Sequence, residues 1–90
     1  MFIVVACDIT DDRRRTRLHT RLKSFGTPVQ YSIFECLLDE RQFADMQAVV
    51  RKNIHRKQDL VRYYNLCESC RAKIKAINGA VTTVEETVVI

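Results

Sequence analysis

Glycine and proline are scarce in this sequence, with two glycines and one proline among 90 residues. Flexible linkers and low-complexity segments are rich in such residues, and the sequence contains no such segment and no internal repeat. Hydrophobic residues make up 47% of the chain and charged residues 29%, a balance that excludes intrinsic disorder. The composition therefore predicts a single globular domain over residues 1–90.

The sequence also lacks a hydrophobic run long enough to cross a membrane. A membrane-spanning helix needs about 20 apolar residues. The apolar stretch at residues 1–7 is far too short for this, and it lacks the basic leader of a signal peptide. We therefore expect a cytoplasmic protein with no membrane partner. In a reducing compartment, the four cysteines are expected to remain thiols.

Histidine is rare, and neither His19 nor His55 has a cysteine or serine at a spacing typical of a nucleophilic site. We assign catalysis to neither.

Cys67 and Cys70 form one CxxC motif, which is half of a zinc site without a second pair at ligand spacing. The motif does not open a long helix after an early strand, as a thioredoxin-type motif does, so we interpret it as structural or incidental.

Apolar periodicity and turn residues predict the element order β-α-β(β)-α-β-(short α)-β. The expected strands cover residues 2–9, 29–38, 59–66 and 81–90, and the expected helices cover 12–25, 39–54 and, as a short helix or turn, 67–78. A break in alternation near residues 32–35 indicates either one kinked strand or two short strands. The predicted fold is an α+β ferredoxin-like sandwich, a mostly antiparallel sheet with two helices on one face. The extra C-terminal strand 81–90 is expected to contribute to contacts in a homodimer.

Basic residues outnumber acidic ones, 15 to 11, and the excess favours an anionic partner. Six of them fall in one segment: Arg13, Arg14, Arg15, Arg17, Arg21 and Lys23. In the helix expected there, Arg14 and Arg15 flank the apolar stripe and should lean over the end of the sheet near Asp8. The segment is interpreted either as a phosphate-binding surface or as a solvated helix face.

Asp8 is an ionisable residue that ends an otherwise apolar central strand. Its carboxylate either bonds backbone amides and nearby arginines or binds a metal ion. One carboxylate supplies few of the oxygen ligands that Mg²⁺ or Mn²⁺ needs, but a twofold dimer axis near Asp8 would let two copies of the chain share one ion. Ser32 and Phe34 supply a hydroxyl and an aromatic ring on the next strand, which suit a nucleic-acid site but also suit an ordinary strand with Phe34 in the core.

These residues together resemble the small CRISPR-associated endoribonuclease family, the companion of the CRISPR integrase. The matching positions are Asp8-Ile9-x-Asp11-x-Arg13-Arg14-Arg15, then Leu18, Leu22 and Gly26, then Val29-Gln30-Tyr31-Ser32-Ile33-Phe34-Glu35-Cys36, then Asp59-x-Val61-Arg62-x-Tyr64-x-Leu66-Cys67-x-x-Cys70. The resemblance runs almost end to end.

The resemblance implies a ferredoxin-like homodimer whose two Asp8 carboxylates flank a Mg²⁺ ion at the interface. It implies phosphodiester hydrolysis of RNA or DNA in some members, with Asp8 as the metal ligand. Matching positions that support phosphate or line the cleft are Arg15, Arg17, Ser32 and Phe34. The family's usual aromatic residue before the aspartate is Cys7 here, so a ring that would stack on substrate is missing.

The resemblance also implies a role in CRISPR adaptation, as a bridge between two integrase dimers with duplex DNA over basic surfaces. Three functions stay open on the sequence. The first is a metal-dependent endonuclease, the second a non-catalytic DNA-binding scaffold, and the third a stand-alone toxin-like ribonuclease.

Overall fold

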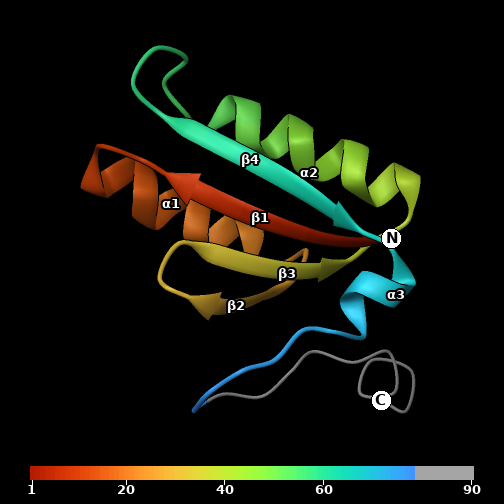
Figure 1. Ribbon diagram of the computed structural model, residues 1–90. Coiled ribbons are helices and arrows are strands. Elements are labelled where there is room, and N and C mark those ends of the chain that lie inside the picture. Colours follow the sequence, from red (N-terminus) through yellow and green to blue (C-terminus); the bar gives the residue numbers. More distant parts are fainter. Residues whose placement is uncertain (79–90) are drawn as a thin grey trace.

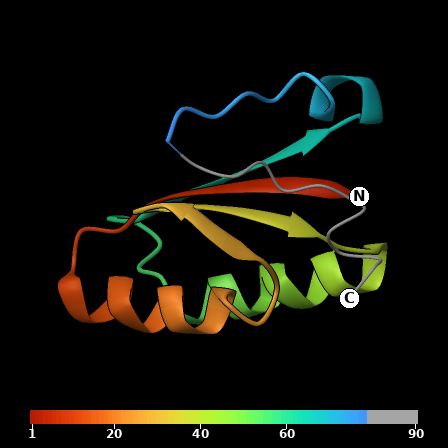
Figure 2. The same ribbon diagram turned by 90° about the horizontal axis from the view of Figure 1, so that it is seen from below.

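The computed structural model describes residues 1–78 (Figure 1). Its elements are β1 (Phe2–Asp8), α1 (Asp12–Leu22), β2 (Thr27–Gln30), β3 (Ile33–Leu37), α2 (Glu40–Lys52), β4 (Leu60–Leu66) and α3 (Glu68–Arg71). The strands form one sheet in the order β2-β3-β1-β4, with every neighbouring pair antiparallel. The long helices α1 and α2 cover one face of this sheet (Figure 2). This is the ferredoxin-like α+β sandwich expected from the sequence.

The core lies between this sheet face and the two helices. Ile3 and Val5 occupy alternate positions of the central strand β1, so both point to the same face of the sheet, and both are fully buried. They pack in one cluster with Leu18 and Leu22 of α1 and with buried side chains of α2 and β3. Capping fixes where the helices begin, since Asp11 caps α1 and Asp39 forms a capping box with Gln42 at the start of α2. No helix in residues 1–78 is both long and apolar enough to cross a membrane.

The opposite face of the sheet, which we call the distal face, carries apolar side chains together with the charged residues Glu35 and Arg62. Strand pairing places Val4 of β1 between Glu35 of β3 and Tyr64 of β4 on this face. Leu60 and Tyr64 are about half exposed there, at 50% and 47%. The short helix α3 lies on the same side as this face (Figure 2), with the Arg71 guanidinium 4.8 Å from the centre of the Phe2 ring.

Some boundaries differ from the prediction. The segment predicted as strand over 29–38 forms two strands, β2 and β3, which cover residues 27–30 and 33–37 and are separated at Tyr31 and Ser32, so the interpretation as two short strands is confirmed. Helix α1 ends at Leu22 instead of Phe25 because the chain turns over residues 23–25 before β2. The strand expected at residues 81–90 lies outside the described residues.

Gly26 is required for close packing and not for an unusual backbone angle. Gly26 follows the turn that ends α1, and its φ is not positive. A Cβ atom at this position would lie 2.5 Å from the Glu35 carbonyl oxygen, 3.0 Å from Cys36 Cα and closer still to the Cys36 sulfur. The turn after α1 therefore lies directly against β3.

We expect Gly26→Ala to lower the free energy of unfolding by about 1–3 kcal/mol, because backbone atoms of β3 must move to admit the methyl group. Urea denaturation measures this. Ser24→Ala, an exposed change in the same turn, is the control and should cost less than about 0.5 kcal/mol. Equal free energies of unfolding for the two variants would contradict the close contact, because they would show that the turn and β3 can move apart at little cost.

Candidate nucleic-acid and metal site

Asp8 is the last residue of the central strand and points into solvent at the end of the sheet. Strand alternation puts it on the distal face, opposite Leu60 of β4. Within residues 1–78 its carboxylate accepts no hydrogen bond and forms no ion pair. The expectation that Asp8 only bonds nearby amides or arginines therefore finds no support in the described part of the chain, and its oxygens are available to a ligand.

A cavity of about 360 Å³ lies beside Asp8, between α1 and the start of β3. Leu18, Leu22 and Phe34 form its apolar part, and these side chains belong to the core. Its polar lining comes from Asp8, Arg15, His19, Tyr31 and Ser32. A cavity of this size, with an apolar wall and a few converging polar groups, suits a small organic group such as a nucleobase.

Three of the predicted site residues thus meet Asp8 around one cavity: Arg15, Ser32 and Phe34. Ser32 is tied to the end of β1, because the Cys7 amide donates a 2.9 Å hydrogen bond to the Ser32 carbonyl oxygen. Phe34 is only 1% exposed and packs edge-on against His19, with 5.0 Å between ring centres. Phe34 therefore supports the cavity from the core and is not exposed for stacking on a base, contrary to its assignment as a nucleic-acid contact.

Arg15 stands at the edge of this cavity in a fixed position. Its guanidinium donates to the Ile9 carbonyl oxygen at 3.1 and 3.3 Å, to the Tyr31 hydroxyl at 3.2 Å and to the Asp12 carboxylate. The group also lies 5.8 Å from the centre of the Tyr31 ring. These contacts orient a positive charge beside Asp8 and hold the Tyr31 side chain near it.

Tyr31 and His19 line the cavity, and neither was given a role from the sequence. Tyr31 is 76% exposed, and an exposed aromatic ring offers a face on which a base can stack. The exposure of Tyr31 could have been predicted if the sequence had been interpreted as two short strands, because Tyr31 then falls in the two-residue link between them. An interpretation as one continuous strand gives no reason to expect an exposed ring. His19 carries no such signal, since its contact with Phe34 depends on how α1 packs on β3.

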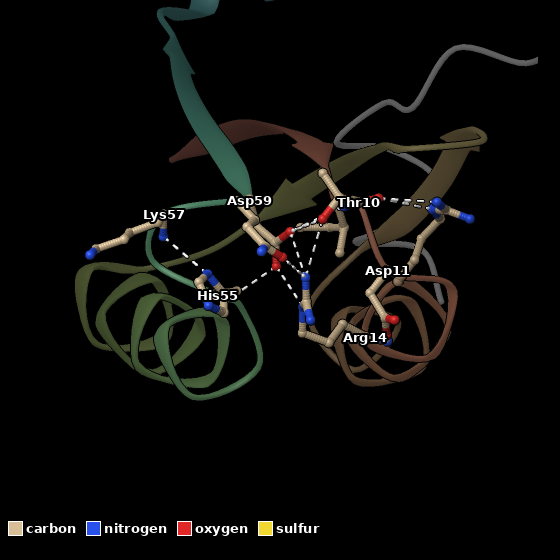
Figure 3. Close-up of polar contacts among 9 residues, drawn as sticks. Thr10, Asp11, Arg14, His55, Lys57 and Asp59 are labelled. Atoms are coloured by element: carbon tan, nitrogen blue, oxygen red, sulfur yellow. Dashed lines mark hydrogen bonds and ion pairs between the residues drawn. The ribbon is translucent and has the colours of Figure 1, made fainter.

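Arg14 is held away from the cavity by a buried partner, Asp59 (Figure 3). Arg14 Nε lies 2.8 Å from Asp59 Oδ2, and the Asp59 side chain has no exposed surface. The same carboxylate accepts hydrogen bonds from the Thr10 amide and hydroxyl and from the His55 amide. Arg14 thus lies over the end of the sheet near Asp8, as expected, and joins the start of α1 to the loop before β4. Its assignment as a phosphate contact stays a prediction.

This network lowers the pKa of the Asp59 carboxyl group. The hydrogen bond from Arg14 is the largest cause that lowers the pKa of Asp59, followed by the backbone bonds from His55 and Thr10. The carboxylate therefore stays ionised far into the acid range, and the ion pair fixes the loop that leads into β4 at neutral pH.

Arg17 lies on the exposed side of α1 and does not line the cavity. Within residues 1–78 its side chain has no hydrogen-bond or ion-pair partner, unlike Arg14 and Arg15. Its charge is therefore available to a phosphate on a longer strand that extends beyond the cavity.

A metal ion at Asp8 would need ligands beyond one chain's own side chains. No three histidine, cysteine, aspartate or glutamate side chains in residues 1–78 are grouped so that they could hold an ion. Asp11 and Asp12 follow closely but bond the Arg14 amide and the Arg15 guanidinium. The Asp8 carboxylate is a hard oxygen ligand of the kind that Mg²⁺ and Mn²⁺ prefer, and such ions bind through one or two carboxylates together with water and substrate phosphates.

The fold and this site define a small ferredoxin-like protein with an exposed carboxylate at the end of its central strand and arginines around it. The family model of CRISPR associated protein Cas2 matches residues 1–74. This chain belongs to the Cas2 family.

Individual relatives agree. The chain is 40% identical over 87 residues to "CRISPR-associated endoribonuclease Cas2 3" of Chloroflexus aurantiacus, covering 97% of this chain and 94% of the relative. Its fold matches the crystal structure of the hypothetical protein TT1823 from Thermus thermophilus with a TM-score of 0.77 and 38% identity, over 86% and 89% of the two chains. A chain of the "Partial Cas6-RT-Cas1--Cas2 complex" shares the fold at 24% identity and a TM-score of 0.64, over 89% and 93% of the two chains.

Proposed function

We propose that this protein is a metal-dependent endonuclease of CRISPR adaptation that cleaves RNA or DNA at a site shared by two chains. The observation that carries the proposal is the exposed carboxylate of Asp8, a residue that lines a cavity whose other polar groups include Arg15. A relative that is 40% identical is named an endoribonuclease, which supports the same chemistry. The divalent ion, Mg²⁺ or Mn²⁺, is expected to be held by Asp8 from each subunit of a homodimer.

The distal face supports the dimer. Half-exposed Leu60 and Tyr64 lie there beside Val4, and a second copy would remove this apolar surface from water. Asp8 lies at one end of the same face, opposite Leu60. A twofold axis through this region would therefore bring the two Asp8 carboxylates together.

Each residue then has a distinct task. The ion, when bound, would lower the pKa of a water molecule and neutralise charge on the phosphate. Arg15 would place a fixed positive charge beside the scissile phosphate, and Tyr31 would stack on an adjoining base. Ser32 would offer a hydroxyl hydrogen bond at the cavity wall. Arg17 would hold a phosphate further along the strand.

The direct test is a cleavage assay with purified full-length chain on single-stranded RNA, single-stranded DNA and duplex DNA. We expect cleavage of at least one substrate with Mg²⁺ or Mn²⁺ and none after chelation. A protein that cleaves equally well in chelator would refute a metal-dependent site.

Arg17→Ala should weaken nucleic-acid binding without changing the fold, because the side chain is exposed and lacks partners in the described residues. Loss of one phosphate contact should reduce the slope of log Kobs against log salt by about 0.9 for duplex DNA and about 0.7 for a single strand. Fluorescence anisotropy at several salt concentrations measures this slope.

Arg41→Ala is the matched control, since Arg41 is an exposed arginine in the first turn of α2. That turn lies at the other end of β1 from Asp8, because the Leu38 amide bonds the Met1 carbonyl oxygen at 2.9 Å. An equal change of slope in both variants would mean that binding depends on overall charge and not on Arg17.

A second candidate function is a DNA-binding scaffold that bridges dimers of the CRISPR integrase. It is favoured by the similar fold of a chain in the "Partial Cas6-RT-Cas1--Cas2 complex", whose name joins Cas1 with Cas2. The exposed arginines of α1 would serve duplex DNA in this role without any hydrolysis. The two functions are compatible, and replacement of Asp8 separates them.

A further inference from the structure

The CxxC segment lies outside the site at Asp8 and begins α3 directly after β4. Cys67 is the residue that caps α3, and Cys70 lies three positions on, in the same turn. Both side chains are exposed. Cys67 Sγ lies 3.4 Å from the backbone nitrogen of Cys70, so the Cys67 sulfur is already folded over the first turn toward the second cysteine.

Hydrogen bonds from Ser69 and Cys70 stabilise a negative charge on the Cys67 sulfur. The Cys70 amide donates a hydrogen bond to Cys67 Sγ at 3.4 Å, and the Ser69 hydroxyl oxygen lies 3.2 Å from the same sulfur. The bond from Ser69 is the largest cause that lowers the pKa of Cys67 to about 7. Its hydrogen bond with Cys67 raises the pKa of Cys70. One thiol of the pair is therefore prepared to attack, and the other stays protonated until the first has reacted.

The remaining cysteines of the same chain provide the contrast. Cys36 is buried in the core, and Cys7 packs against that core from β1. Burial raises the pKa of each thiol to about 11. Both are thus small hydrophobic side chains with inert sulfur, whereas the CxxC pair has exposure, proximity and an ionisable sulfur.

We propose that Cys67 and Cys70 form a redox-active dithiol site that exchanges with low-molecular-weight disulfides such as oxidised glutathione. The Cys67 thiolate attacks one sulfur of the small disulfide, forms a mixed disulfide and releases one small thiolate, which takes up a proton. The Cys70 thiol then loses its proton and attacks the Cys67 sulfur, which releases the second small thiol. Two protein thiols are oxidised to one disulfide, and one small disulfide is reduced to two thiols.

The CxxC pair is connected to the distal face through the residue that follows it. Arg71 follows Cys70 directly, and its guanidinium lies 4.8 Å from the centre of the Phe2 ring at the start of β1. A disulfide across the first turn of α3 would fix the part of the helix that carries this contact. The dithiol does not depend on cleavage at Asp8, so its test is independent of the proposed function.

The experiment incubates the full-length chain in glutathione buffers of graded ratio, quenches with acid, alkylates the remaining thiols and maps them by mass spectrometry. We expect a Cys67–Cys70 disulfide while Cys7 and Cys36 stay reduced. At pH 7 the ionised fraction of Cys67 exceeds that of an ordinary cysteine about 15-fold, and its lower basicity costs about fivefold in nucleophilicity, which leaves about a threefold faster reaction. Ser69→Ala should remove most of this gain.

Two variants test the order of the steps. Cys70→Ser should stop the exchange at a stable mixed disulfide on Cys67. Cys67→Ser should leave Cys70 to react alone, about threefold more slowly than the first step of the wild-type pair and with no internal disulfide as product. Both variants should retain the wild-type rate of nucleic-acid cleavage, because neither residue lines the cavity. The proposal is overturned if no Cys67–Cys70 disulfide forms in buffers that oxidise a peptide of residues 66–71, or if Cys70 reacts first.

Discussion

Replacing Asp8 with asparagine is expected to lower metal-dependent cleavage at least 100-fold while nucleic-acid binding persists. The amide keeps the size of the side chain but removes the negative charge that a divalent ion needs. Loss of residues that merely orient a metal ligand costs about 10–100-fold, so loss of the ligand itself should cost at least the upper end of that range. The variant should fold normally, since Asp8 is exposed and accepts no hydrogen bond from residues 1–78.

The control is Asp45→Asn, an exposed carboxylate in α2 that is remote from the cavity. It should cleave at the wild-type rate. If both variants lost activity equally, the loss would reflect net charge and not a metal ligand.

Co-expression of differently tagged chains extends this experiment to the dimer. If two Asp8 carboxylates share one ion, only dimers with two intact copies are active. Random pairing of equal amounts of wild-type and Asp8→Asn chains should then leave about one quarter of the activity. About one half would show that each chain works alone and would contradict the shared site.

Spacer acquisition in cells separates cleavage from the scaffold role. If Asp8→Asn abolishes cleavage but leaves acquisition intact, the bridging function needs no hydrolysis. If both are lost, the same carboxylate serves both. The Arg17→Ala variant should lower acquisition in either case, because it removes a phosphate contact.

Replacing Asp59 with asparagine should lower the free energy of unfolding by about 2–3 kcal/mol. Asp59 accepts five hydrogen bonds, two from Arg14, two from Thr10 and one from His55. An amide offers one acceptor oxygen and turns an NH₂ group toward donors that it cannot satisfy. The side chain has no exposed surface, so water cannot replace the lost partners. Urea denaturation at pH 7 measures the loss, with Asp45→Asn as the exposed control.

The same variant should change how stability depends on pH. The pKa of Asp59 is lower in the folded chain than in the unfolded chain, where it is near 4. Its contribution is therefore complete above the unfolded pKa and is lost as the pH falls through the folded value. The difference between wild type and Asp59→Asn should be constant above about pH 5 and should shrink in acid. A difference that persisted unchanged at pH 2 would contradict the ion pair as its source.

The architecture could be predicted because its signals are local. Apolar periodicity placed the sheet and helices, and Asp39 with Gln42 marked the start of α2. Asp8 was recognisable because a lone carboxylate at the end of a buried strand stands out in sequence. The partner of Arg14 was not recognisable, because Asp59 lies 45 positions away and the two meet only when β4 joins β1.

Exposure was the other quantity that sequence could not supply. Phe34 and Tyr31 are aromatic residues in one segment, yet one is 1% exposed and the other 76%. Which ring faces the core depends on the end of β2, where the register with β3 shifts between Pro28 and Gln30. A bulge of this kind moves neighbouring side chains between faces, and periodicity alone does not locate it.

Metal stoichiometry tests the central claim most directly. Titration of the full-length chain with Mn²⁺, followed by electron paramagnetic resonance and combined with the mass of the complex in solution, counts ions per chain. We predict one ion for every two chains and no bound ion in Asp8→Asn. One ion bound per chain, or full occupancy in a monomer, would contradict a site built from one carboxylate of each subunit.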